Sequence, residues 1–271
     1  MTKSLLVIIA SLFMPMLSYS QVGTYNNDTL INYIDINMKK QGKWVKKYDD
    51  GQVRYKGFFI NDEPVGTFIY YHTNGKIKSI LDYTYPDAVK AELYYPDATI
   101  AAAGKYNKSR ERIGLWKMYY ESGDLFAEIN YKANVKHGTS TTYYPSGVIL
   151  MECTFVDGLL QGSYVKYFDT GKPYEIGSYK NNQRHGECSV YDLTNQLTEK
   201  GPYFEGMRHG VWYFFAEGNI VDTVTFTYDM PDNFDEISKE TQEKIEWARQ
   251  NQDKFKQPED YFDRPEDFFK P

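Results

Sequence analysis

The chain has 271 residues, of which 41% are apolar and 17% aromatic, and its 26 tyrosines favour a half-buried sheet surface over a thick two-layer core. The formal net charge of −6 disfavours nucleic acid or an anionic membrane surface as the main partner.

Residues 1–20 have the pattern of a secretory signal peptide. A basic residue is followed by the apolar stretch 5–17, and Ser18–Ser20 supplies small residues at the −3 and −1 positions of a cleavage site. The alternative is an N-terminal membrane anchor, although the apolar stretch is short for a bilayer span and contains Pro15. Cleavage would leave Gln21, not a lipid-accepting cysteine, at the new N-terminus. We therefore expect an exported chain, periplasmic or extracellular, whose mature part is soluble and has no transmembrane segment.

The segment 21–41 precedes the first full repeat. Its stretch Leu30–Ile34 is apolar and β-prone, and it can add an edge strand to the structure that follows.

A period of 24 residues governs residues 42–228 and predicts eight tandem units. Seven units begin with a glycine, and unit three has Lys90 at the equivalent position. A second glycine closes a turn nine residues later in most units, whereas Asn195 takes this place in unit seven, and units three and eight turn one residue earlier. The unit glycines are Gly42, Gly66, Gly114, Gly138, Gly162, Gly186 and Gly210.

Each unit contains two strands. The stretch 125–131 alternates apolar and polar residues, which indicates one buried and one wet face. Twenty-four residues leave no room for a crossover helix, so neighbouring strands are antiparallel. The sequence predicts an all-β fold, an elongated single-layer antiparallel sheet of tandem hairpins. Glycines recur within the second strand, where a bare backbone would let a neighbouring aromatic ring lie flat; these are Gly57, Gly104, Gly177 and Gly201.

A helix is expected to cap the end of the array within residues 229–256. Asn233–Glu236 reads as a capping box, and an apolar stripe follows on one helix face. Repeat arrays need such an end cover. The last segment, 257–271, is rich in proline, acid and phenylalanine, and we interpret it as disordered or as a short docking peptide.

Two aromatic rows are the candidate binding residues. They form the hydrophobic layer of a thin solenoid or, alternatively, a platform that stacks sugars or grips extended peptides. At the ends of the first row, Trp44 and Trp212 are the rings we expect to be exposed. The first row, two residues after the unit glycines, is Trp44, Phe68, Trp116, Tyr164 and Trp212. The second, five residues after them, is Tyr71, Tyr119, Tyr143, Tyr167 and Tyr191.

No constellation of catalytic residues is found, so we predict a protein that is not an enzyme and needs no cofactor or metal. Histidines precede three unit glycines, at His137, His185 and His209. Equivalent positions in successive hairpins lie about 9.6 Å apart, too far for shared zinc coordination. Thr170–Lys172 is a hairpin turn without the spacing of a phosphate loop. We interpret acidic residues such as Asp97 as turn residues, and a calcium contact is the alternative interpretation.

Two cysteines, Cys153 and Cys188, lie in strands three spacings apart, about 14 Å. A disulfide needs Cα atoms within about 7 Å, so two free, buried thiols are expected.

The pattern Gly-x-Trp-x-x-Tyr-Tyr-x-x-Gly, clearest at 114–123, resembles the bacterial MORN-repeat variant, including the YwqK-type antitoxin family. Repeats of this kind are mostly platforms, so the resemblance implies binding rather than catalysis. Unit three departs at both glycines, and unit five has Ser140 where tryptophan is expected; these units are irregular or accommodate a partner.

The leading hypothesis is a protein–protein interaction scaffold in the cell envelope whose protein partner the sequence does not identify. The resemblance implies a second hypothesis, an antitoxin or immunity protein that blocks a toxin, although export argues against a cytoplasmic target. A third is a carbohydrate-binding module that uses the aromatic rows to hold a glycan.

Overall fold

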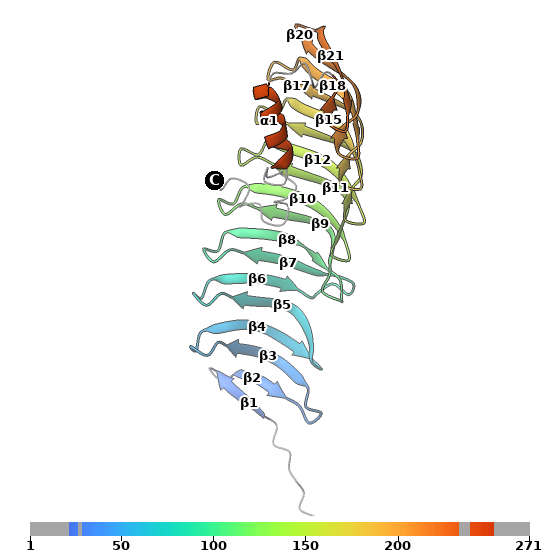
Figure 1. Ribbon diagram of the computed structural model, residues 1–271. Helices are drawn as coiled ribbons and strands as arrows, with labels where there is room; N and C mark the ends of the chain where they lie inside the picture. Colours follow the sequence, from blue (N-terminus) through green and yellow to red (C-terminus); the bar gives the residue numbers. More distant parts are fainter. Residues whose placement is uncertain (1–21, 27–28, 233–238, 252–271) are drawn as a thin grey trace, which may run out of the picture.

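The computed structural model describes residues 22–26, 29–232 and 239–251. The expected signal peptide, 1–20, and the expected tail, 257–271, lie outside the described residues. Within them, one open antiparallel sheet of 22 strands runs the length of an elongated molecule (Figure 1). This confirms the predicted fold class.

The strands pair antiparallel in chain order, apart from three two-residue strands, each of which shares its partner with the strand that follows it. Those of the N-terminal segment and of units one to four are β1 (Val22–Asn26), β2 (Thr29–Ile34), β3 (Lys40–Lys47), β4 (Val53–Ile60), β5 (Glu63–Tyr71), β6 (Ile77–Asp82), β7 (Val89–Tyr94), β8 (Ile100–Tyr106), β9 (Arg112–Tyr119) and β10 (Leu125–Lys132). Those of units five to eight are β11 (Val135–Tyr143), β12 (Ile149–Val156), β13 (Leu159–Leu160), β14 (Gly162–Tyr167), β15 (Pro173–Lys180), β16 (Gln183–Arg184), β17 (Gly186–Tyr191), β18 (Leu197–Phe204), β19 (Met207–Arg208), β20 (Gly210–Ala216), β21 (Asn219–Thr227) and β22 (Met230–Pro231). The predicted edge strand corresponds to β2, which pairs with both β1 and β3.

The turns explain why the strands stay in register. At one edge of the sheet, successive units are joined by two-residue turns such as Asn61–Asp62, whose φ angles are 52° and 71°. Two positive φ values define the hairpin turn whose twist matches that of the strands. At the other edge the loops close on a glycine such as Gly51, with φ 89°, as the sequence predicts.

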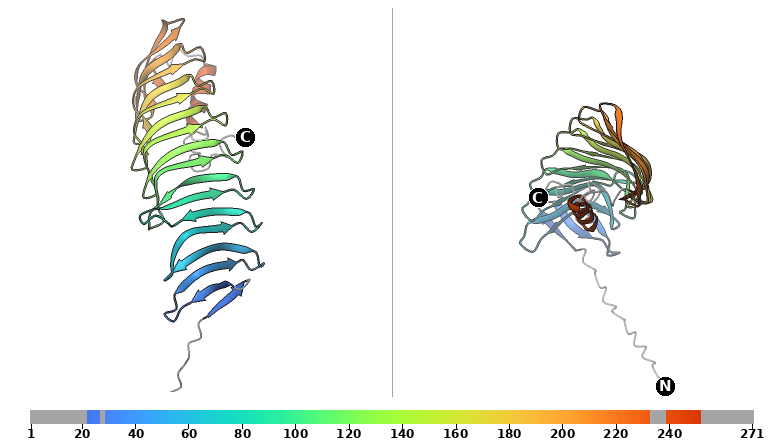
Figure 2. Two further views of the ribbon diagram at one scale, coloured as in Figure 1. Left: turned by 180° about the vertical axis from the view of Figure 1, so that it is seen from behind. Right: turned by 45° about the horizontal axis from the view of Figure 1, so that its top comes forward.

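The strands curve around the side on which the helix α1 (Lys239–Gln250) lies (Figure 2). Ile245 and Ala248 of this helix line a cavity together with Val224 and Phe226 of β21. Val224 pairs with Trp212, so the tryptophan row lies on the same, concave face. The opposite face is convex.

Aromatic rings on the concave face pack on bare glycine backbone. A Cβ atom added at Gly104 would overlap the indole of Trp116, and one at Gly201 would lie 2.5 Å from ring atoms of Trp212. Gly57 receives Phe68 in the same way. The predicted role of these glycines is therefore confirmed. At Gly177 the ring is Tyr164, from the same hairpin.

Hydrogen bonds tie each of units one to five to the next. The bonds join a side chain at the end of one unit's first strand to a backbone carbonyl in the following unit. The five bonds are Tyr48 Oη to Tyr71 O (2.7 Å), His72 Nε2 to Tyr94 O (3.0 Å), Tyr95 Oη to Tyr119 O (2.8 Å), Tyr120 Oη to Tyr143 O (2.8 Å) and Tyr144 Oη to Tyr167 O (2.8 Å).

The C-terminal helix is confirmed, and its described part is Lys239–Gln250. Near the start of the predicted segment 229–256, Met230–Pro231 forms the strand β22 instead. The expected capping box, 233–236, lies outside the described residues. Among the helices that the structure describes, none is long and apolar enough to cross a membrane.

Candidate functional site

Unit three interrupts the regular sheet. The connections that flank it are the stretches 83–88 and 107–111, in place of the two-residue turns that join most units. They lie at the same edge of the sheet, one before and one after the hairpin β7–β8. Between them the concave face opens into a cavity of about 780 Å³.

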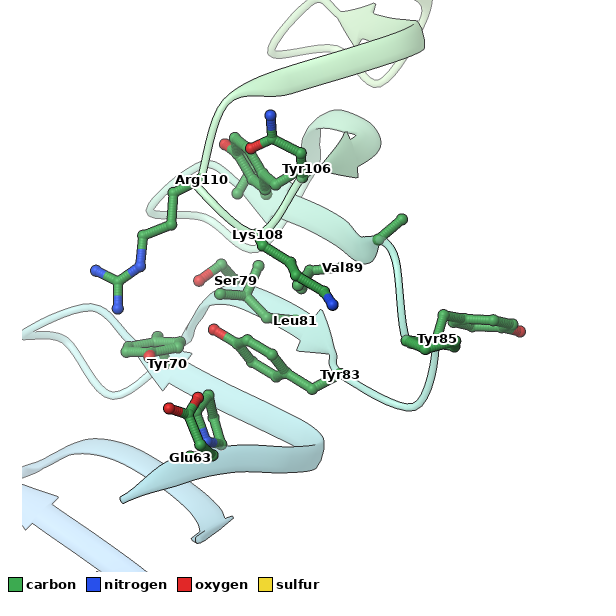
Figure 3. Close-up of a pocket in the computed structure, with 15 residues that line it drawn as sticks. Glu63, Tyr70, Ser79, Leu81, Tyr83, Tyr85, Val89, Tyr106, Lys108 and Arg110 are labelled. Atoms are coloured by element: carbon green, nitrogen blue, oxygen red, sulfur yellow. The ribbon is translucent and has the colours of Figure 1, made fainter. Parts of the chain in front are cut away.

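The floor of this unit-three pocket is apolar and its walls are phenolic. Leu81, Val89 and Leu93 line it together with Tyr70, Tyr83, Tyr85 and Tyr106. Figure 3 shows Tyr70 and Tyr83 side by side, with Arg110 reaching toward them from the β8–β9 connection. Lys108 and Arg110 form a basic rim, and Glu63 stands on the opposite side.

The pocket offers neutral hydroxyl groups and exposed cations. Burial raises the pKa of Tyr70, of Tyr83 and of Tyr106 above the usual phenol value, so all three are protonated at neutral pH. The positive charge of Arg110 opposes this rise in the pKa of Tyr70 and Tyr83, which places the guanidinium within electrostatic range of both rings. A ligand with an apolar or aromatic group and a carboxylate matches this lining.

The pocket lies where a row of basic side chains is interrupted. Two residues before the unit glycines, most units carry a lysine or arginine that stacks on an aromatic ring of the concave face. Units two, three and six have Pro64, Ala88 and Leu160 there instead, and the first two of these line the pocket. The stacked pairs, with distances to the ring centroid, are Lys40 on Phe59 (4.9 Å), Arg112 on Tyr131 (4.1 Å), Lys136 on Phe155 (5.4 Å), Arg184 on Tyr203 (5.2 Å) and Arg208 on Trp212 (4.4 Å).

Units six to eight hold a second polar group of residues on the concave face. The Tyr164 hydroxyl donates to Glu175, and Arg184 lies 3.4 Å from the same carboxylate. The side chain of Glu175 is only 5% exposed. Burial and this carboxylate raise the pKa of Tyr164 far above its usual value, so the phenol stays neutral. These groups satisfy one another, and we interpret the cluster as structural.

The two aromatic rows fall on opposite faces of the sheet. Phe68, Trp116, Tyr164 and Trp212 are 0–2% exposed on the concave face, whereas Trp44 is half-buried. The expectation that Trp212 is exposed is wrong, because Arg208 lies over its indole at 4.4 Å. Buried rings already packed on glycine offer no open face to a sugar.

The second row lies on the convex face. Tyr143 donates to Glu128 and Tyr167 to Glu152, both carboxylates of that face, at 2.9 and 2.6 Å. Tyr71 lies near Lys56, 5.6 Å from its ring centroid. Rows three residues apart in a strand point to opposite sides, so the two rows do not form one site. All five tyrosines of this second row, including Tyr119 and Tyr191, are half-buried.

The other sequence candidates remain structural. His137 contacts Asp157 at 3.3 Å, and His185 and His209 flank the ring of Phe204 at 5.6 and 5.8 Å. Across the described residues, no group of three or more histidine, cysteine or acidic side chains could hold a metal ion. Thr170–Lys172 forms the turn between β14 and β15.

Neither cysteine forms a disulfide in the structure and both are buried, as expected from their strands. Cys153 lies on β12 and Cys188 on β17, and β14 and β15 pair between them. Burial raises the pKa of the Cys188 thiol to about 11, which makes this thiol unreactive at neutral pH.

The basic row and the unit-three pocket were missed by the sequence reasoning. A signal for both was present, because the position two before each unit start is a lysine or arginine in five units but Pro64, Ala88 or Leu160 in units two, three and six. Except for Trp212, the aromatic partners of this row belong to the neighbouring strand, which only the pairing register reveals.

Comparison with known proteins supports the repeat assignment. Five segments, 40–61, 64–85, 112–133, 136–157 and 160–181, match the profile described as "MORN repeat variant". They correspond to units one, two, four, five and six, so the resemblance inferred from the sequence is confirmed for a tandem β-hairpin repeat of this kind over five units. The antitoxin part of that resemblance stays a prediction. No curated protein matches the chain.

Two solved structures are similar over part of their length. The crystal structures of TcdB2-TccC3-Cdc42 and TcdB2-TccC3-TEV share 10% sequence identity with the chain, with TM-scores of 0.23 and 0.24. The alignments cover 77% and 76% of this chain but only 13% and 14% of those chains. Likeness at this level carries no argument about function.

Proposed function

We propose that this chain is an exported, non-catalytic scaffold of the cell envelope that binds a protein partner on its concave face, with the unit-three pocket as the anchor. The observation that carries the proposal is this pocket, a cavity of about 780 Å³ lined by apolar, phenolic and basic side chains. The repeat match favours an interaction role over catalysis. Export rests on the signal-peptide pattern of residues 1–20.

The lining of the pocket favours a peptide over a glycan. Except for Trp44, the rings of the first aromatic row pack on glycine backbone, so stacking of a sugar on these rings is blocked. The pocket instead combines an apolar floor, phenol donors and the two cations Lys108 and Arg110. A polypeptide that presents an apolar anchor beside a carboxylate satisfies all three features.

A pull-down with matched charge variants tests this function. The chain from Gln21 onward is used as bait in an envelope extract, beside Arg110→Glu and Lys78→Glu. Both residues are exposed, but Lys78 lies on the convex face of β6. Loss of a specific protein with Arg110→Glu and its retention with Lys78→Glu supports the proposal. Equal capture by both variants contradicts it. Fractionation of a tagged full chain tests export.

A further inference from the structure

The segment that follows α1 contains a duplicated motif. Residues 258–262 read Pro-Glu-Asp-Tyr-Phe, and residues 265–269 read Pro-Glu-Asp-Phe-Phe. Each copy places two acidic residues directly before two aromatic rings. Within 257–271, five acidic side chains stand against two basic ones, a net charge of −3. A short acidic and aromatic motif in two copies is typical of a docking peptide rather than of a neutral linker.

The chemistry of this motif matches the unit-three pocket. Leu81, Val89 and Leu93 provide an apolar floor for a phenylalanine ring. Lys108 and Arg110 on the rim provide cations for the adjacent carboxylates (Figure 3). Pairs in which a cation donates to a carboxylate are stronger than neutral hydrogen bonds.

The position of α1 and the length of the segment that follows it allow the segment to approach the pocket. The helix lies on the concave side, and in Figure 1 it extends from the level of β17 to that of β10–β12. Eleven extended residues, 252–262, reach about 36 Å, whereas eighteen, 252–269, reach about 59 Å. The second copy has the longer reach and two phenylalanine rings, which suit an apolar floor better than a tyrosine hydroxyl does.

We propose that the unit-three pocket is occupied by the chain's own second motif, with Phe268 or Phe269 on the apolar floor and Glu266 and Asp267 against the basic rim. This inference rests on the proposed function, in which the same pocket is the partner site, and it adds regulation to that site. A tethered occupant has a high effective concentration, so the tail competes with any partner and lowers its apparent affinity.

Hydrogen exchange of the full chain from Gln21 onward tests occupancy in cis. Amides of the connections 83–88 and 107–111 should exchange about tenfold faster in Phe268→Ala/Phe269→Ala than in the unmodified chain, since docking protects them. The matched control is Tyr261→Ala/Phe262→Ala, which changes the first copy and should leave exchange unchanged. Equal exchange in the unmodified chain and the Phe268→Ala/Phe269→Ala variant overturns the inference.

A binding measurement tests the chemistry of the contact. A fluorescent peptide of residues 257–271 is added to the full chain that carries Phe268→Ala/Phe269→Ala, which leaves the pocket empty. Introducing Arg110→Glu should weaken binding about tenfold through charge reversal at the rim, while Lys78→Glu should not. Arg110 is an exposed turn residue, so folding of this variant is checked by its melting temperature. If Arg110→Glu leaves the affinity for the peptide unchanged, the inference is overturned.

The outcomes separate this inference from the proposed function. If the Phe268→Ala/Phe269→Ala variant captures more partner from the extract than the unmodified chain, both stand. If partner capture depends on Arg110 but is the same in the tail variant, the pocket is the partner site and the tail does not occupy it. If neither variant changes capture while the peptide still binds at Arg110, the tail docks but the pocket is not the partner site.

Discussion

The stability of the array can be tested where one ring meets one glycine. Trp116 is 1% exposed, its indole lies on the backbone of Gly104, and its Nε1 donates to the carbonyl of Lys105 at 3.1 Å. Trp116→Ala removes the ring and leaves a cavity between β8 and β9. Truncations of buried large aromatic residues lower the free energy of unfolding by about 3–5 kcal/mol.

The reverse change should also destabilise the chain. A Cβ atom at Gly104 would overlap the indole, so Gly104→Ala forces the ring out of place and costs about 1–3 kcal/mol by overpacking. In the Trp116→Ala background this clash is absent. Alanine is then the better strand residue, since glycine loses more conformational freedom on folding, by about 0.5–1 kcal/mol. The double variant should therefore be no less stable than Trp116→Ala alone.

Denaturant unfolding of the four chains measures this cycle. We expect the two changes to be non-additive by about 1–3 kcal/mol. The matched control is Leu115→Ala, a neighbouring residue 45% exposed, which should change stability little. Hydrogen exchange should report the damage in units three to five, because a repeat array is held by contacts between neighbours. Additive effects would refute the ring-on-glycine packing, and an unchanged melting temperature for Trp116→Ala would make an aromatic platform the leading hypothesis.

Three further predictions concern shape, thiols and acid. Small-angle scattering should give a radius of gyration well above the globular value of about 18 Å, since eight hairpins with strands about 4.8 Å apart make a sheet roughly 75 Å long; a value near 18 Å contradicts the fold. Mass spectrometry of the mature native protein should find no disulfide between Cys153 and Cys188, and native thiol labelling should be slow because burial raises the pKa of Cys188 to about 11. Hydrogen bonds from Thr194 and Gln196 lower the pKa of Asp192, and turn hydrogen bonds lower that of Asp97. Their stabilisation is complete above the unfolded pKa, about 3.9, and is lost as the pH falls through the lower folded value; a melting temperature unchanged between pH 7 and pH 2, or an acid transition that Asp192→Asn leaves unaltered, would contradict this.

The fold was predictable because period and turn chemistry are local. The glycine spacing sets the length of each hairpin, and turn residues such as Asn61 and Asp62 set its register. The packing of Trp116 on Gly104 followed from the same period. Helix bounds were less predictable, because Met230–Pro231 pairs with β21 before the chain leaves the sheet.

The faces of the two aromatic rows were predictable in principle but were not separated in the sequence reasoning. Their members within a unit, such as Trp116 and Tyr119, are three residues apart, and an odd spacing in a strand points to opposite faces. The cover over Trp212 could not be predicted in the same way. It depends on Arg208, whose guanidinium crosses the ring at 4.4 Å, and the direction of a long side chain depends on the packing around it.

The location of the pocket follows from what the regular units do with their own concave face. There, an aromatic ring packs on glycine backbone, a long cation covers the aromatic layer, and a tyrosine hydroxyl donates a hydrogen bond to a carbonyl of the next unit. On such a face the rings, cations and hydroxyl groups already contact groups of the same chain, so few of them are available to a partner. Unit three lacks the cation, because Ala88 stands at that position, and longer connections replace the two-residue turns on both sides of its hairpin. The proposed binding site therefore lies where the period fails, in the unit in which Lys90 stands in place of the unit glycine.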